Sequence, residues 1–139
     1  MAKFKFRLET VRKVRDRARE DAKREYLEAI ARRVQAEAER DEIQKRLAAI
    51  ASFPARDITD RFSQDAMILR LTDDVGSQET VISILLIEED EARRAYLQAR
   101  QDAEAIERLR EKRHAEWLAE EDRLENLALD EWATQRRWA

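Results

Sequence analysis

The fold is decided by the stretch YLEAIARRVQAEAERDEIQKRLAAI, residues 26–50. It contains neither Gly nor Pro, and small or apolar residues recur at alternating steps of three and four. That spacing is the heptad pattern of a left-handed coiled coil. The seam positions are Tyr26, Ala29, Arg33, Ala36, Arg40, Ile43, Leu47 and Ile50. We therefore predict a long helix that packs against a second helix along this seam.

The same pattern continues toward the N-terminus. Stepping back by threes and fours adds the seam positions Phe4, Leu8, Val11, Arg15, Ala18 and Ala22. We predict one helix over about residues 4–51, about 70 Å long at the usual rise of ~1.5 Å per residue. Two successive steps of four around Ala22 predict a stutter, where the supercoil unwinds locally.

A second seam with unbroken spacing follows the only glycine. Its positions are Leu85, Glu89, Ala92, Tyr96, Ala99, Ala103, Ile106, Arg110, Arg113, Trp117, Glu120, Leu124 and Leu127. We predict a second helix over about residues 78–137. Both seams are rich in alanine and carry arginine, so they bury little apolar area. We therefore expect marginal stability, with a melting midpoint below about 75 °C.

Residues 52–77 separate the two seams and contain the only proline and the only glycine. A short helix over about 55–72 is predicted, because Ile58, Phe62, Ala66 and Leu69 fall on one helical face. We expect a turn over 73–77. The residues that motivate these boundaries are Ser52 and Ser77 as caps, Pro54 in a first helical turn, and Gly76 at a position of positive φ.

The charge distribution predicts that the two helices fold back on each other. Residues 1–24 carry ten Lys or Arg and four Asp or Glu, whereas residues 115–139 carry three Arg and seven Asp or Glu. An antiparallel arrangement sets the basic start against the acidic end. The predicted fold is all-α, a single domain over 1–139, and an antiparallel two-helix coiled-coil hairpin with a short helical or loop segment at its tip.

Composition argues against an enzyme. The chain has no Cys, a single histidine at His114, and 42% charged residues. We expect no catalytic residue, cofactor or metal site, since the carboxylate pairs lie among many charges rather than in a desolvated cleft. No apolar run reaches the ~20 residues that a membrane helix needs, and we expect a cytosolic protein.

The segment Val81–Ile87 is unusually apolar, because six of its seven residues are large and apolar. A two-helix seam buries only about two positions in seven, so such a helix has apolar surface on every side. Either the short middle helix covers the surplus, or the surface binds a partner. The candidate partner-binding residues are Ile43, Leu47, Ile50, Ile82, Leu85 and Leu86.

The basic run Arg12–Arg19 has three interpretations. It pairs with the acidic C-terminal end, docks onto an acidic protein surface, or binds nucleic acid. Interspersed acids and the absence of interleaved aromatics weaken the last of these. Trp117 is expected to pack on the seam, and Trp138 is either an interface anchor or frayed.

The opening FKFRLETVRKVR, residues 4–15, resembles the start of the FliJ family of flagellar export proteins. The closing LDEWA, residues 129–133, looks like the end of that family. The resemblance implies a stalk-like component of the type III export apparatus, cytoplasmic and peripherally associated with the inner membrane at the flagellar base. The implied ATPase-binding residues are Phe4, Phe6, Leu8, Val11, Arg15, Asp130 and Glu131.

The implied partners are the hexameric export ATPase ring, the large export-gate membrane protein and export chaperones. The resemblance further implies no small-molecule substrate, and we expect a monomer when the protein is free. The host machine is either the flagellum or the related injectisome. Two alternatives stay open: a structural coiled coil that forms a dimer or tetramer, and an RNA-binding helical hairpin.

Overall fold

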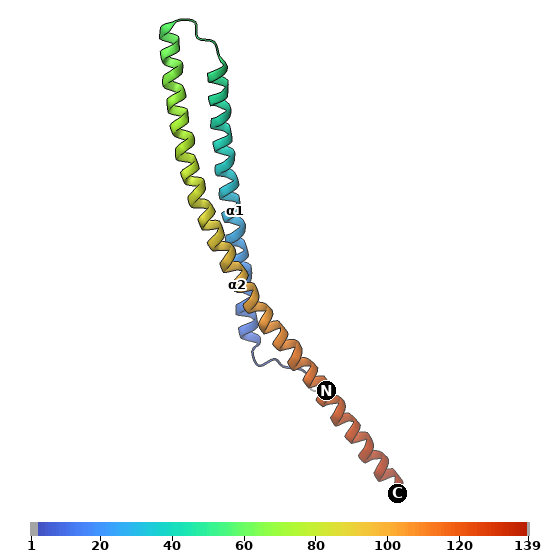
Figure 1. The fold of residues 1–139 in the computed structure, drawn as a ribbon. Helices are drawn as coiled ribbons and strands as arrows, with labels where there is room; N and C mark the ends of the chain where they lie inside the picture. Colours follow the sequence, from blue (N-terminus) through green and yellow to red (C-terminus); the bar gives the residue numbers. More distant parts are fainter. Residues whose placement is uncertain (1–2, 139) are drawn as a thin grey trace. The chain divides into compact units, whose positions relative to one another are not determined.

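The computed structural model describes residues 3–138 and has two α-helices within that range (Figure 1). α1 spans Glu9–Ser52, and α2 spans Ile58–Trp138. The helices run antiparallel and pack against each other, which confirms the all-α helical hairpin. The hairpin divides into two compact units, described one at a time below. Unit 1 joins residues 3–20 to 97–138, and unit 2 is Asp21–Tyr96.

In unit 2, the seam of α1 lies where the heptad pattern predicts. Every seam position from Ala22 to Ile50 is buried or half-buried, and Ala29 and Ala36 are the most covered. Tyr26 stacks on Tyr96 of α2, with ring centroids 6.1 Å apart. These contacts confirm that small residues and one aromatic pair hold the two helices together here.

An arginine–carboxylate pair fills the polar positions of this seam. Arg33 of α1 binds Glu89 of α2 through two hydrogen bonds, one from Nη2 to Oε1 at 3.3 Å and a shorter one from Nε. Arg33 also donates to Glu37 one turn further along α1, at 3.2 Å. A charged residue at a seam position is therefore stabilised by pairing, since its side chain is about three-quarters covered.

The predicted tip segment is wrong, because one continuous helix replaces the short helix and the turn. α2 begins at Ile58 and runs through residues 73–77 without interruption, and Gly76 does not have positive φ. The physical reason is a seam that continues upstream. Its covered positions, at alternating steps of three and four, are Gln64, Ile68, Leu71, Val75, Gln78, Ile82 and Leu85.

Burial outweighs the helix-breaking tendency of glycine at this point. Leu71 and Ile82 are only 8% and 5% exposed on either side of Gly76. Burying one such side chain contributes roughly 1.5–3 kcal/mol, whereas a glycine inside a helix costs about 1 kcal/mol. Gln78 adds interhelical hydrogen bonds from its Nε2, at 3.0 Å to the Ala36 carbonyl and 3.1 Å to Glu39.

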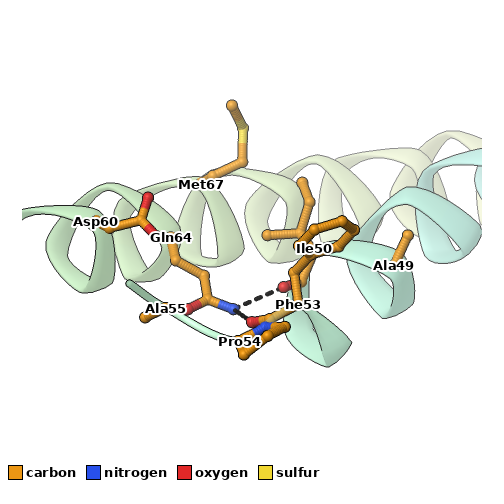
Figure 2. Close-up of a pocket in the computed structure, with 8 residues that line it drawn as sticks. All are labelled: Ala49, Ile50, Phe53, Pro54, Ala55, Asp60, Gln64 and Met67. Carbon is orange, nitrogen blue, oxygen red and sulfur yellow. Dashed lines mark hydrogen bonds between the residues drawn. The ribbon is translucent and has the colours of Figure 1, made fainter. Parts of the chain in front are cut away.

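Residues 53–57 connect the two helices, and polar side chains cap both ends of this connection. Asp57, rather than Ser52, caps α2: its Oδ1 accepts a hydrogen bond of 2.7 Å from the amide of Asp60. Gln64 of α2 reaches back to α1 and donates from Nε2 to the carbonyls of Ile50 and Phe53, at 2.7 and 2.8 Å (Figure 2). These bonds add a partner to the Ile50 carbonyl in the last turn of α1 and satisfy the Phe53 carbonyl just beyond it.

In unit 1, α1 begins later than predicted and presents a different face to α2. The helix starts at Glu9 rather than Phe4. The half-covered positions are Leu8, Arg12, Asp16 and Arg19, one residue away from the predicted row of Val11, Arg15 and Ala18, which is exposed. Consecutive steps of four, four and three replace the predicted spacing, and no stutter at Ala18–Ala22–Tyr26 is needed. Ion pairs, described below, decide which face turns inward.

The predicted pairing of the basic start with the acidic end is also wrong. Arg12 and Arg15 approach Glu107 and Asp102 of α2, at 3.7 and 3.5 Å, not the acids after Trp117. The reason is the unequal length of the helices, since α1 has 44 residues and α2 has 81. The last part of α2, residues 118–138, therefore extends without α1 beside it. We name residues 118–138 the C-terminal overhang.

Candidate functional site

Residues 3–8 precede α1, end in a turn at Arg7 and Leu8, and lie against α2; we name them the N-terminal strap. Phe4 packs on His114 and Trp117, with ring centroids 4.9 and 5.9 Å away. Phe6 and Leu8 are half-buried in the same contact. The strap and α2 enclose a groove of about 620 Å³. Aromatic packing of Phe4 explains why this segment leaves the helix that the sequence pattern predicts.

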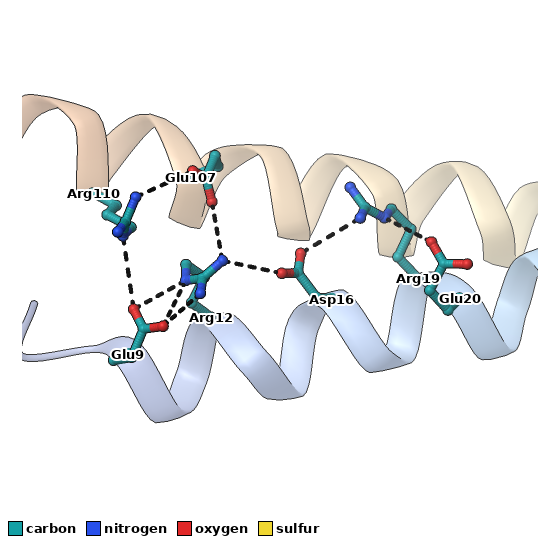
Figure 3. Close-up of polar contacts among 7 residues, drawn as sticks. All are labelled: Glu9, Arg12, Asp16, Arg19, Glu20, Glu107 and Arg110. Atoms are coloured by element: carbon teal, nitrogen blue, oxygen red, sulfur yellow. Dashed lines mark hydrogen bonds and ion pairs between the residues drawn. The ribbon is translucent and has the colours of Figure 1, made fainter.

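An ion-pair network joins the start of α1 to α2 beside the strap (Figure 3). Arg12 is at its centre and contacts Glu9, Asp16 and Glu107. Arg110 of α2 approaches Glu9 at 3.7 Å. Arg12 reaches Glu107 and Glu9 reaches Arg110 of α2, so the face of α1 that carries Glu9 and Arg12 lies toward α2 and the Val11 face lies outward.

The network shifts the protonation of its members. The hydrogen bond from Arg12 lowers the pKa of Glu9 below its ordinary value of 4.5, with the positive charge of Arg110 adding to the effect. The same bond raises the pKa of Arg12. On the overhang, a hydrogen bond from Arg123 lowers the pKa of Glu120 in the same way. These carboxylates stay ionised at neutral pH, as expected for an ion-paired surface rather than an acid–base site.

The overhang is an unpaired helix with apolar and acidic side chains. Every residue from Leu118 to Trp138 is exposed except Glu121, which is half-buried. Trp138 is 87% exposed, and Trp132 packs only under Arg136, whose Cζ lies 5.0 Å from the ring centroid. The exposed apolar side chains are Leu118, Leu124, Leu127, Leu129, Trp132 and Trp138. A helix face of this kind is typical of a surface that another protein covers.

The residues that the resemblance marks for ATPase binding fall into three groups within unit 1. Phe4, Phe6 and Leu8 come together in the strap groove. Val11 and Arg15 lie on the exposed face of α1. Asp130 and Glu131 lie on the overhang, about 20 Å beyond Trp117 at the helical rise of ~1.5 Å per residue. The geometry thus offers three separate surfaces rather than one pocket.

In unit 2, apolar side chains cover the outer side of α2. The exposed members are Val81, Ile84, Leu86 and Ile87, and we name them the α2 apolar patch. The interpretation that a short middle helix covers the surplus is wrong, since the segment that was to form it is the first part of α2 itself. Phe53, Ile58, Phe62 and Leu69 are further exposed apolar residues toward the connection.

Most of the predicted partner-binding residues line the seam instead of the surface. Ile82 is buried, and Leu85 is half-buried in the heptad row of α2. Ile43, Leu47 and Ile50 are half-buried in the row of α1. Only Leu86 of the six is exposed. Heptad phase read through residues 64–85 would have separated these buried positions from the exposed patch.

A shallow pocket of about 420 Å³ lies at the connection between the helices (Figure 2). Its lining is mostly apolar, with Ile50, Phe53, Pro54 and Met67, and the amide of Gln64 forms its floor. The Nε2 of Gln64 is fully used in capping α1, as described above. The pocket holds no acid–base or nucleophilic pair, so it suits an apolar side chain rather than a reacting substrate.

Comparison with protein families gives a decisive match. The family described as "Flagellar FliJ protein" matches residues 4–139. The chain belongs to the FliJ family. Comparison with curated proteins gives no match, and comparison with solved structures gives none. The match spans both helices, the strap and the overhang, so the resemblance of the two chain ends is confirmed over essentially the whole sequence.

Membership of the FliJ family makes this chain a flagellar export-related protein. The family is a structural component of export rather than a family of enzymes. Among the helices of residues 3–138, none combines the length and the apolar character needed to cross a membrane.

Proposed function

We propose that this protein is a cytoplasmic, peripherally membrane-associated stalk of the flagellar export apparatus, which binds the hexameric export ATPase through unit 1. One observation carries the proposal. The C-terminal overhang offers about 30 Å of helix with exposed leucines, two tryptophans and six acids, and α1 does not run beside it. A single helix, about 10–12 Å wide with its side chains, is slim enough to enter the central opening of a ring of subunits.

The asymmetry of the stalk gives the mechanism. One helix in a six-fold ring makes different contacts with each subunit, so it stabilises different subunit conformations unequally. Asp130 and Glu131 supply charge to these contacts, and the strap groove with Phe4 presents a second apolar surface at the base of the overhang. Binding of this kind raises ATP hydrolysis by assembling the ring and by making its subunits non-equivalent.

We further propose that the α2 apolar patch binds the export gate or an export chaperone. Val81, Ile84 and Ile87 follow one another at single helical turns and expose 43–61% of their area. Single exposed leucines are common on the surfaces of soluble proteins, but contiguous apolar residues on one helical face favour binding of a helix or strand from a partner protein. This assignment keeps Leu86 of the sequence-based candidates and replaces the buried ones.

The test compares two double variants of equal chemistry. Leu124→Glu with Leu127→Glu alters the overhang, and Ile84→Glu with Ile87→Glu alters the α2 apolar patch. All four positions are about half exposed, so both variants are expected to keep the helical circular-dichroism signal. ATP hydrolysis by the cognate export ATPase is measured with each variant, and capture of the gate protein's cytoplasmic part is measured in parallel.

We expect the overhang variant to lose ATPase stimulation and to retain gate capture, and the patch variant to do the reverse. Unchanged stimulation by a folded overhang variant contradicts the ATPase proposal. Unchanged capture of gate and chaperones by the patch variant contradicts the second proposal and leaves the first standing.

A further inference from the structure

Unit 1 has a second uncovered apolar surface besides the overhang, a row of exposed side chains at the start of α1. Val11, Val14 and Ala18 are all exposed, and Val14 exposes 61% of its area. Their spacing of three and four is that of a helix-packing seam, yet Arg12 and its ion pairs turn the neighbouring face toward α2. Unit 1 thus contains a row of apolar residues at heptad spacing that its own second helix does not cover.

The overhang has the same spacing. Leu124, Leu127 and Glu131 follow one another at steps of three and four, continuing the seam of α2 beyond the point where α1 begins. A parallel alignment of the two rows places Leu124 beside Val11 and Leu127 beside Val14. Within one molecule this alignment is impossible, since α1 runs antiparallel to α2. A second copy in inverted orientation provides it.

Charge supports the same alignment. Five basic side chains in the strap and early α1 have no ion pair within the described residues: Lys3, Lys5, Arg7, Lys13 and Arg17. Five acids of the overhang are likewise unpaired in that part of the chain: Glu121, Asp122, Glu125, Asp130 and Glu131. In the parallel alignment, Glu121 lies beside Leu8 and so next to Arg7 of the strap, and Asp130 lies beside Arg17.

The lengths also agree. The overhang has about 21 residues, and the stretch of α2 that lies beside residues 3–20 runs from about 97 to 117, again about 21 residues. A two-fold axis near Trp117 therefore lays each overhang along the whole basic stretch of the other copy. Every contact is made twice, as in an isologous interface.

We infer that the free protein forms an antiparallel two-fold dimer in which the acidic overhang of each copy packs on the strap and the Val11–Val14 face of the other. This replaces the expectation of a monomer. The dimer covers the overhang that we propose for ATPase binding, so it is a resting form that a partner must open. The inference itself stands on unit 1 and needs no ATPase.

Sedimentation equilibrium of the full chain tests it, over protein concentrations up to about 1 mM. We expect a monomer–dimer equilibrium that weakens at least tenfold between 50 mM and 500 mM salt, because exposed charges are screened. Arg7→Glu with Arg17→Glu weakens dimerisation at least tenfold, and so does Glu121→Lys with Asp130→Lys. The chain that carries all four substitutions regains at least half of the lost free energy of dimerisation.

Apolar contact and orientation are tested separately. Leu124→Glu with Leu127→Glu abolishes the dimer, while Phe62→Glu with Leu69→Glu, a matched pair of exposed residues in unit 2, leaves it unchanged. The chain has no Cys, so Val14→Cys on one chain and Leu127→Cys on another form a mixed disulfide on gentle oxidation. The inference is overturned if the chain stays monomeric at every protein concentration. It is also overturned if the Phe62 and Leu69 variant loses the dimer while the Leu124 and Leu127 variant keeps it. Failure here leaves the ATPase-stimulation result untouched, and an unaltered chain that dimerises but does not stimulate the export ATPase overturns only the proposed function.

Discussion

Gly76→Ala is expected to stabilise the protein, and the sign of the effect tests the continuity of α2. In the structure Gly76 is helical, on the outer side of α2, and a Cβ built there meets no atom within 4 Å. Alanine therefore gains the whole difference in helix propensity, about 0.8–1.0 kcal/mol. If residues 73–77 formed a turn with Gly76 at positive φ, the same change would instead cost roughly 1–2 kcal/mol.

The expected shift in melting temperature follows from the size of the chain. With an unfolding entropy of about 2.1 cal/mol/K per residue, 139 residues give about 0.29 kcal/mol/K, so a gain of 0.9 kcal/mol raises the midpoint by about 3 °C. The measurement is a circular-dichroism melt at 222 nm. A midpoint that falls by 3 °C or more in Gly76→Ala would refute the continuous helix.

Ser77→Ala provides an independent control next to the same position. As the cap of a new helix, Ser77 would contribute about 1 kcal/mol, which alanine removes. Inside a continuous helix its replacement by alanine is neutral or stabilising by up to about 0.5 kcal/mol. Stabilisation of both variants supports the structure, whereas destabilisation of both restores the predicted turn.

Three further predictions concern contacts within each unit. Tyr96→Ala removes the stacking partner of Tyr26 from a half-covered seam and is expected to lower the free energy of unfolding by about 2 kcal/mol, measured by urea denaturation; a loss below about 0.5 kcal/mol would show that this pair does not hold unit 2 together. Glu89→Gln leaves Arg33 without its interhelical carboxylate and lowers the melting midpoint, while Glu37→Gln, which alters only an intrahelical contact of the same arginine, lowers it less; the reverse order would contradict the interhelical role. The hydrogen bond from Arg12 lowers the pKa of Glu9 in the folded protein, so the stability that Glu9 contributes is complete above its ordinary pKa of 4.5 and is lost as the pH falls through the lower folded-state pKa. Glu9→Gln removes this titration and should make the melting midpoint fall less steeply between about pH 5 and pH 3. An unchanged slope of midpoint against pH would count against the network.

Heptad spacing by itself was enough to predict the hairpin and the buried face of α1 from Tyr26 to Ile50. The reason is local: apolar residues spaced alternately by three and four positions define one helical face, and alanine or a large aliphatic residue on that face packs against whichever helix lies opposite. The match at both chain ends likewise predicted the family. Within the seam of α2, positions from Leu85 to Arg110 were predicted on the same grounds and are covered.

Only the tertiary structure decided where the helices end relative to each other, and with that the candidate site. By helix propensity alone, Gly76 predicts a break in the helix, but burial of Leu71 and Ile82 against α1 outweighs this preference. The heptad pattern places Val11 on the seam, but the face of α1 that packs on α2 is the one from which Arg12 reaches Glu107, a residue 95 positions away in the chain. Net charge predicted that the basic start meets the acidic end, yet Glu9 at the start of α1 lies beside Arg110, so residues 118–138 extend beyond the start of α1. Register depends on the sum of contacts along both helices, and no single segment of sequence contains that sum.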